Sequence, residues 1–176
     1  MKSIKILIVF ITVIGCRNDN FLLDSTPPLF TIPPIPIAQV SSFIPFGQFL
    51  TPTQQNPAIE YFGNQSDIPV VSVSEGIVVD VRRNPTIDDF EIWIKPSNNA
   101  TWLIIYDHVV EVTISKGDQV QTGSLLGTIG LGNRVELQVN DDQNIAHCPL
   151  QFGTSSFIQQ HMNLYEEWCV EETVTP

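Results

Sequence analysis

The sequence predicts an all-β domain of antiparallel sheets with a short C-terminal helix, and two observations support this fold class. First, residues 67–140 repeat short segments rich in β-branched residues, separated by turn residues at the intervals usual in β-barrels and sandwiches. Second, no long amphipathic helical pattern interrupts them, which disfavours a parallel sheet with crossover helices. The expected strands lie within IPVVSV, GIVVDVR, DFEIWIK, ATWLIIYD, VVEVTI, SLLGTIG and NRVELQV.

The first residues have the pattern of a bacterial export signal. Lys2 and Lys5 precede an apolar run, residues 6–14, that is too short for a stop-transfer helix. The sequence VIGC that follows resembles the lipobox of bacterial lipoproteins, in which Cys16 is diacylated and becomes the new N-terminus. We therefore expect a signal peptide over residues 1–15 and a lipid-anchored protein of the bacterial cell envelope, periplasmic or surface-facing, that does not cross the membrane. An ordinary signal peptide cleaved elsewhere is the alternative.

The chain is acidic. Its formal net charge is −11, and loss of the two lysines of the signal peptide would leave −13. This charge argues against binding to nucleic acid and against loose attraction to anionic membranes or cell-wall polymers. Any such polymer would have to be recognised by shape.

Proline dominates the segment before the predicted strands. Residues 17–57 contain eight of the 13 prolines, which are disfavoured in helices and in central strands. Residues 16–40 are therefore predicted to form an extended tether. Apolar residues in the later half of the proline-rich stretch indicate packing along the domain, which we expect to span residues 41–176.

The end of the chain is predicted to be a short helix held by a disulfide. In SSFIQQHMNLYEEWC, apolar residues recur at helical spacing, and Ser156 and Gln159 have the spacing of a capping box. With Cys16 assigned to lipid, Cys148 and Cys169 remain as an even pair in an exported protein, most simply a disulfide. Closing a loop of this size stabilises a fold by about 3 kcal/mol. Two ligands of a soft metal site are the alternative, although no C-x-x-C pair is present.

Residues 112–130, VTISKGDQVQTGSLLGTIG, carry the most specific local pattern, in which glycines supply the positive φ of two turns. The segment resembles the kGD-V-xxG-xxlG element of barrel-sandwich hybrid domains. That superfamily includes biotinyl and lipoyl carriers, adaptors of export pumps and the M23 metallopeptidases of LytM/lysostaphin type. The chain has neither a modifiable lysine in a Met-Lys-Met-like setting nor long helical hairpins, which disfavours the first two groups.

Three further stretches are similar to M23 motifs and occur in the family's order. Residues 68–78 resemble the opening hairpin, residues 102–109 resemble the strand with the Tyr-x-His motif, and residues 56–61 have the spacing of the His-Pro-x-x-Asp metal motif. The resemblance runs from about Pro45 to Asn140. It implies an M23-like barrel-sandwich of antiparallel sheets.

The resemblance also identifies the positions at which M23 enzymes hold zinc. It implies that Asn56, Glu60 and Glu136 stand at the ligand positions, and that His108 and Arg134 stand where two histidines assist the attack of bound water. Only His108 is a histidine, so the preference of zinc for nitrogen and sulfur is not met.

These substitutions predict a vestigial site without metal. Arg134 brings a permanent cation, and an ion pair with Glu60 or Glu136 would satisfy the charges. A hard-cation site made by Asn56, Glu60 and Glu136 is the alternative. We expect His108, at the end of an apolar strand, to be a hydrogen-bonded structural residue.

Three aromatic residues are candidates for contacts in a groove beside this site. Trp93 alternates with polar residues along its strand and is the best candidate for an exposed contact. Trp102 and Tyr106 share a strand face with His108 and either line the groove or pack in the core.

Together these features predict an exported lipoprotein whose M23-like domain is catalytically degenerate and needs no cofactor. The resemblance implies binding to an envelope protein such as a cell-wall amidase, or to a peptidoglycan peptide. The alternative is an active metalloendopeptidase that cuts peptidoglycan with zinc on variant ligands. A surface lipoprotein that only presents loops is a third possibility.

Overall fold

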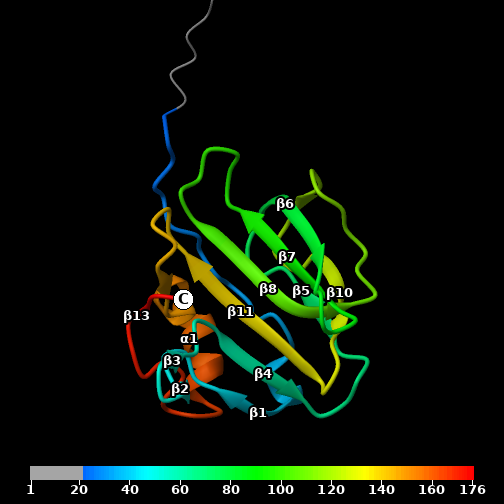
Figure 1. Cartoon of the computed structure of the whole chain (residues 1–176), viewed down its shortest axis with the longest axis vertical. Helices are drawn as coiled ribbons and strands as arrows, with labels where there is room; N and C mark the ends of the chain where they lie inside the picture. The colour runs from blue at the N-terminus through cyan, green and yellow to red at the C-terminus, as the bar shows by residue number, and fades with distance from the viewer. Residues whose placement is uncertain (1–21) are drawn as a thin grey trace, which may run out of the picture.

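A computed structural model of the chain describes residues 22–176 and has the predicted all-β architecture with one short α-helix (Figure 1). The predicted signal peptide, residues 1–15, and Cys16 lie outside the described residues. None of the helices in the described part has the length and apolar character needed to span a membrane.

One large antiparallel sheet forms the body of the domain. Its main path runs β1-β4-β11-β8-β7-β6-β9, while β10 pairs with β5 and β8, and β12 pairs with β11 and β13. A separate hairpin consists of β2 (Phe49–Thr51) and β3 (Gln54–Gln55). The strands of the large sheet are β1 (Val40–Ile44), β4 (Ile59–Gly63), β5 (Pro69–Val71), β6 (Gly76–Arg83), β7 (Phe90–Lys95), β8 (Leu103–Val110), β9 (Gln119–Val120), β10 (Leu125–Ile129), β11 (Arg134–Asn140), β12 (Ala146–His147) and β13 (Thr173–Val174).

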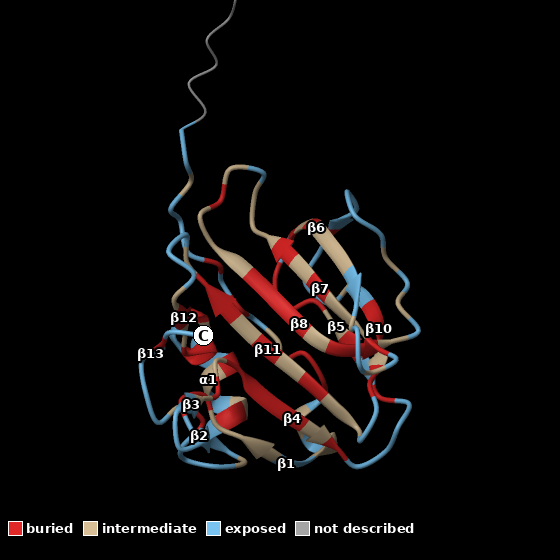
Figure 2. Ribbon diagram, viewed as in Figure 1, coloured by how far each residue is buried: buried red, intermediate tan, exposed pale blue. Residues whose placement is uncertain are grey.

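The period-two alternation of the strands decides which residues face the core. In β11, Val135, Leu137 and Val139 are buried, while the residues between them are only half-buried on the opposite face. Figure 2 shows this alternation of buried and intermediate residues along β11. The polar residues of β11 are therefore displayed together on the open face of the sheet.

The helices are short and lie near the end of the chain, apart from η1 (Ile37–Gln39). The 3-10 helix η2 (Pro149–Phe152) is followed by α1 (Ser155–Met162). The hydroxyl of Thr154 caps α1, accepting a hydrogen bond from the backbone N–H of Phe157 at 3.3 Å. The predicted capping box at Ser156 is wrong, because the extended residue before the first turn is Thr154 and Ser156 lies inside the helix.

The proline-rich segment is packed against the domain over its described part. Asp24 forms a bridge with Ala100 before β8, and the side chains of Phe30 and Ile35 are fully buried in the core. Burial of these apolar side chains holds the segment to the sheet. The packed structure therefore begins near Asp24, ahead of the domain start predicted at Ser41, and residues 24–40 of the predicted tether are packed on the domain.

The predicted disulfide between Cys148 and Cys169 is confirmed, with a Cα–Cα distance of 6.0 Å. It joins the beginning of η2 to the segment that follows α1. Beside it, the buried Trp168 ring stacks on Phe43 with ring centroids 3.9 Å apart. The C-terminal segment is thus attached to the domain by both a covalent bond and aromatic packing.

Candidate functional site

A row of carboxylates crosses the open face of the sheet. Strand register places Glu60 of β4 opposite Glu136 of β11, and Glu136 opposite Asp107 of β8. Like charges on directly opposite residues destabilise a sheet, so this row requires nearby cations.

Arg134 supplies a permanent cation beside this row. It lies two residues before Glu136 on β11 and therefore on the same face. Its Nη1 lies 3.3 Å from Oε2 of Glu60 and 3.9 Å from Oε1 of Glu136. Burial and the charge of Glu136 raise the pKa of Glu60, while Arg134 opposes this rise. The ion pair predicted from the sequence is therefore formed, mainly with Glu60.

His108 lies at the centre of the cluster, with both ring nitrogens in contact. Its Nδ1 is 2.7 Å from Oδ2 of Asp89, and its Nε2 is 3.2 Å from Oε1 of Glu136. Arg134 also contacts Nε2, so Glu136 and Arg134 meet at the same ring nitrogen. Burial alone would lower the pKa of His108, but the hydrogen bonds to Glu136 and Asp89 outweigh it and raise the pKa to about 9. The neighbouring carboxylates therefore favour the protonated form of His108.

Two residues of the cluster were missed by sequence reasoning. Asp89 is fully buried in the loop between β6 and β7, and Asn84 of the same loop donates to Oδ1 of Asp89 at 2.5 Å and to Oδ1 of Asp107 at 2.7 Å. Neither residue stands in a recognisable motif, and only the hairpin fold brings them to His108. The spacing of NPTIDD offers no signal that distinguishes Asp89 from its neighbour.

Asn56 does not join the cluster. It is buried, but its Nδ2 donates to the carbonyl of Pro45 at 3.3 Å and its Oδ1 accepts from the N–H of Ala58 at 3.2 Å. Among the described residues it forms no hydrogen bond with Glu60, His108 or the other clustered side chains. The structure therefore brings together four of the five positions predicted from the sequence, whereas the Asn56 amide hydrogen-bonds to nearby backbone groups.

One group of side chains could offer three ligand atoms to a metal ion. Among the described residues these are Asp89, Asp107 and His108, whose candidate ligand atoms lie within 4.8 Å of one another. The group differs from the set implied by the family resemblance, since only His108 belongs to both.

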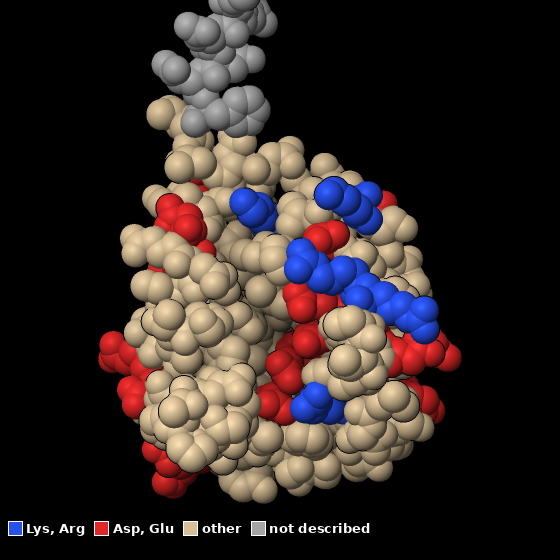
Figure 3. All heavy atoms as spheres, viewed as in Figure 1, with Lys and Arg blue, Asp and Glu red and all other residues tan. Residues whose placement is uncertain are grey.

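A hollow of about 270 Å³ lies beside the cluster on the same face of the sheet. Figure 3 shows acidic side chains along this face, with basic side chains at the margin. One side of the hollow carries carboxylates and the other carries side-chain amides. Its lining residues are Arg82, Glu91, Trp93, Ile105, Asp107, Glu136, Gln138, Asn140, Asn144 and Pro176.

The three aromatic candidates have different positions. Trp93 lines the hollow, with the guanidinium of Arg82 3.8 Å above its ring centre. Tyr106 is instead fully buried, and its hydroxyl accepts a hydrogen bond from the N–H of Val73 at 2.8 Å. Trp102 donates to the carbonyl of Ser25 at 3.0 Å, in the packed N-terminal segment. Of the two roles considered for Tyr106 and Trp102, Tyr106 therefore has the core-packing role, and Trp102 packs on the N-terminal segment and does not line this hollow.

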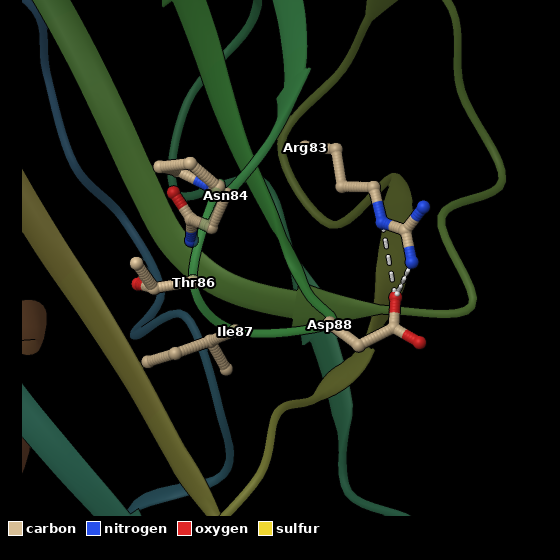
Figure 4. Close-up of a pocket in the computed structure, with 6 residues that line it drawn as sticks. Arg83, Asn84, Thr86, Ile87 and Asp88 are labelled. Carbon is tan, nitrogen blue, oxygen red and sulfur yellow. Dashed lines mark hydrogen bonds and ion pairs between the residues drawn. The ribbon is translucent and has the colours of Figure 1, made fainter.

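A second hollow, of about 530 Å³, lies at the β6–β7 loop (Figure 4). Arg83 and Asp88 point to one side of this loop and form an exposed ion pair of 2.7 Å, while Thr86 and Ile87 point to the other side. The Asn84 side chain is turned to Asp89 and Asp107, as described above. This loop therefore contacts the cluster through Asn84 and Asp89.

A sequence model described as Peptidase family M23 matches residues 54–149, more than half of the chain. The match confirms the family resemblance inferred from the motifs. No curated protein sequence matches the chain.

Solved structures share the fold at low sequence identity. A chain of the SpoIIQ–SpoIIIAH pore-forming complex has a TM-score of 0.59 at 16% identity, over 77% of this chain and 96% of that one. Csd3 from Helicobacter pylori has a TM-score of 0.57 at 18% identity, over 77% of this chain but only 39% of its own. The catalytic domain of the antimicrobial peptidase lysostaphin from Staphylococcus simulans has a TM-score of 0.53 at 17% identity, over 66% of this chain and 93% of its own. At these identities the similarity shows the fold alone.

Proposed function

Because the chain belongs to peptidase family M23, we propose that it is a non-catalytic binding module of the bacterial cell envelope, anchored to a membrane by lipid on Cys16. The observation that carries this proposal is the position of Arg134. Its guanidinium occupies the carboxylate cluster at which the family resemblance implies zinc, 3.3 Å from Glu60.

The residues at the family's metal position do not fit a catalytic zinc ion. None of the three ligand positions holds a histidine, and His108, which stands at an assisting position, already contacts protein groups through both ring nitrogens. The oxygen of Asn56 is engaged by a backbone N–H, and Arg134 lies close to both Glu60 and Glu136. A dication placed there would be repelled by the guanidinium and would lack the nitrogen or sulfur ligands that zinc prefers.

The alternative group of three ligands is also satisfied without metal. Asn84 donates to both Asp89 and Asp107, and Nδ1 of His108 is hydrogen-bonded to Asp89. These hydrogen bonds give both carboxylates and Nδ1 of His108 protein partners, so the group is held together without a metal. We therefore expect the protein to act without a cofactor.

The hollow beside the cluster suggests the chemistry of the ligand. Arg82 is paired with Asp80 at 2.6 Å and Arg134 with Glu60, whereas Glu91, Asp107 and Glu136 all line the hollow. Carboxylates exceed fixed cations here, so a positively charged group is favoured.

Side-chain amides line the other side of the hollow, from Gln138, Asn140 and Asn144. Amides of this kind can both donate to and accept from a peptide backbone. A peptide segment with an amine or guanidinium fits this lining, either from peptidoglycan or from a loop of an envelope protein such as a cell-wall amidase.

Metal content and binding together test the proposal on the purified mature chain. We expect no stoichiometric zinc, no cleavage of peptidoglycan, and binding of an amine-bearing peptidoglycan peptide or a purified cell-wall amidase. Binding should fall at least about tenfold in Glu136→Gln, while the exposed control Asp67→Asn should bind normally. Stoichiometric zinc that disappears together with peptidoglycan cleavage in Glu136→Ala would overturn the proposal.

The second candidate function is that of an active metalloendopeptidase on peptidoglycan. It is favoured by the retained Tyr-x-His motif and by the proximity of Asp89 and Asp107 to His108. In that case a metal-loaded chain would cleave peptidoglycan, and His108→Ala would abolish cleavage without loss of the fold. A surface lipoprotein that only presents loops would bind neither probe.

A further inference from the structure

An exposed apolar surface lies at one end of the molecule, apart from the hollow described above. It is formed by the β2–β3 hairpin and by the segment from the end of α1 to residue 172, and we refer to it as the hairpin–tail surface. Five large apolar side chains on it are between 40% and 63% exposed: Phe49, Leu50, Met162, Tyr165 and Val170. A cluster of exposed apolar side chains on a folded domain marks an interaction site more often than scattered single ones do.

The two parts of the hairpin–tail surface are joined by backbone pairing. The N–H of Phe46 donates to the carbonyl of Trp168 at 3.0 Å, and the N–H of Val170 donates to the carbonyl of Phe46 at 2.9 Å. The Glu171 side chain packs on Gly47, where an added Cβ would come within 2.6 Å of it. Figure 1 draws β2, β3 and α1 in the same region of the view. The exposed side chains of the two segments therefore belong to one surface.

The tail part of this surface is fixed to the domain. The Cys148–Cys169 disulfide fixes the tail, and Tyr165 packs on Phe43 with ring centroids 4.7 Å apart. A preformed surface loses little conformational entropy when a partner binds, so its apolar side chains can contribute to affinity.

The tail segment of this surface is acidic, and no basic residue is near in the sequence. Residues 18–81 and 135–176 contain no Lys or Arg. In the view of Figure 3 the corresponding part of the molecule has acidic groups at its edge, whereas the basic groups lie elsewhere. None of the carboxylates of residues 166–172 forms an ion pair with a described residue. The exposed acidic residues of the tail are Glu166, Glu167, Glu171 and Glu172.

From this combination we propose that the hairpin–tail surface docks a protein partner that presents basic side chains around an apolar centre. Exposed apolar side chains would supply the buried centre of the interface, and the tail carboxylates would pair with the basic rim. An anionic membrane does not fit, because the acidic rim would be repelled by it. In Figure 1 the described part of the chain begins at the top of the view, whereas β2 and β3 lie near the bottom.

The test uses the purified mature chain and a defined probe. The probe is a fluorescent synthetic peptide of alternating leucine and lysine that carries a photo-crosslinking group, and a leucine–glutamate peptide and anionic lipid vesicles serve for comparison. We expect the leucine–lysine peptide alone to bind, more weakly at high salt, and to crosslink to residues 46–51 and 162–172.

Surface variants determine whether the proposed side chains are responsible. Phe49→Ser/Leu50→Ser and Glu166→Lys/Glu167→Lys should each reduce affinity at least about tenfold, because the first removes the apolar centre and the second reverses the rim. All four side chains are exposed, so these variants should retain the fold. The matched controls Leu131→Ser and Asp67→Lys, also at exposed positions, should bind as the wild type does.

Three outcomes of the peptide experiment would overturn the proposal. They are equal binding of the two peptides, crosslinks confined to the residues of the hollow, and preferential binding to the vesicles. Unchanged affinity in both double variants would also refute it.

Discussion

Replacement of Arg134 by alanine tests the charge balance of the candidate site. Arg134 is the fixed cation that accompanies Glu60, and the side chain of Glu60 is only 4% exposed while that of Arg134 is 29% exposed. Removing one partner of a buried ion pair costs about 3–5 kcal/mol, because the other charge remains buried without its counterion. Since Arg134 is partly solvated, we expect the lower end, a loss of about 3 kcal/mol in the free energy of unfolding at pH 7.

The loss should depend on pH in a defined direction. Burial and Glu136 already raise the pKa of Glu60 above its ordinary value of 4.5, and removal of Arg134 raises it further. The folded state then binds more protons than the unfolded state between the two pKa values, so stability falls as pH rises through this window. Arg134→Ala should therefore be less destabilised at pH 5 than at pH 7.

Urea denaturation at both pH values measures this effect. Glu60→Gln in the Arg134→Ala background should recover most of the stability lost at pH 7, because it removes the stranded charge. Arg83→Ala is the matched control, since the Arg83–Asp88 pair is 65% and 75% exposed and should contribute nothing measurable. An equal loss at both pH values without rescue by Glu60→Gln would refute the electrostatic reasoning and indicate packing of the arginine stem instead.

Three further predictions concern stability and anchoring. Burial lowers the pKa of His161 to about 4 from 6.5. The free energy of unfolding should therefore be highest above pH 6.5 and should fall by up to about 3 kcal/mol as pH drops toward 4. In His161→Gln the thermal melting temperature should change less with pH across this range. Cys148→Ala/Cys169→Ala should lower the free energy of unfolding by about 3 kcal/mol in urea titrations, and an unchanged midpoint would contradict the stabilising role of the disulfide. Cys16→Ser should abolish incorporation of radiolabelled palmitate in bacteria, and labelling that persists would exclude the proposed lipid anchor.

Short segments rich in β-branched residues, separated by turn residues, were sufficient to predict the all-β fold. In β11 the alternation of apolar and polar residues separates Val135 and Leu137 from Arg134 and Glu136, because a side-chain period of two is a local property of any strand. The cysteine count likewise predicted the disulfide that the structure contains. Motif order along the chain indicated the M23 family, which the family match confirms.

Neighbours within the site could not be predicted in the same way. Asp89 and Asn84 contact the site only because a hairpin loop folds over the end of β8, and Asn56 is withdrawn from it by hydrogen bonds within its own turn. Strand alternation assigns a residue to a face but does not say which residue of another strand or loop lies beside it.

The sequence alone therefore predicted most of the strands from residue 67 onward, the acidic character and the residues that stand where the family resemblance implies zinc. Tertiary structure decided that Arg134 pairs mainly with Glu60, that His108 lies between Asp89 and Glu136, and that the proline-rich segment is part of the core. The physical reason is that propensity and patterning act over a few neighbouring residues, whereas ion pairs and burial depend on strand register and on contacts between segments far apart in the chain.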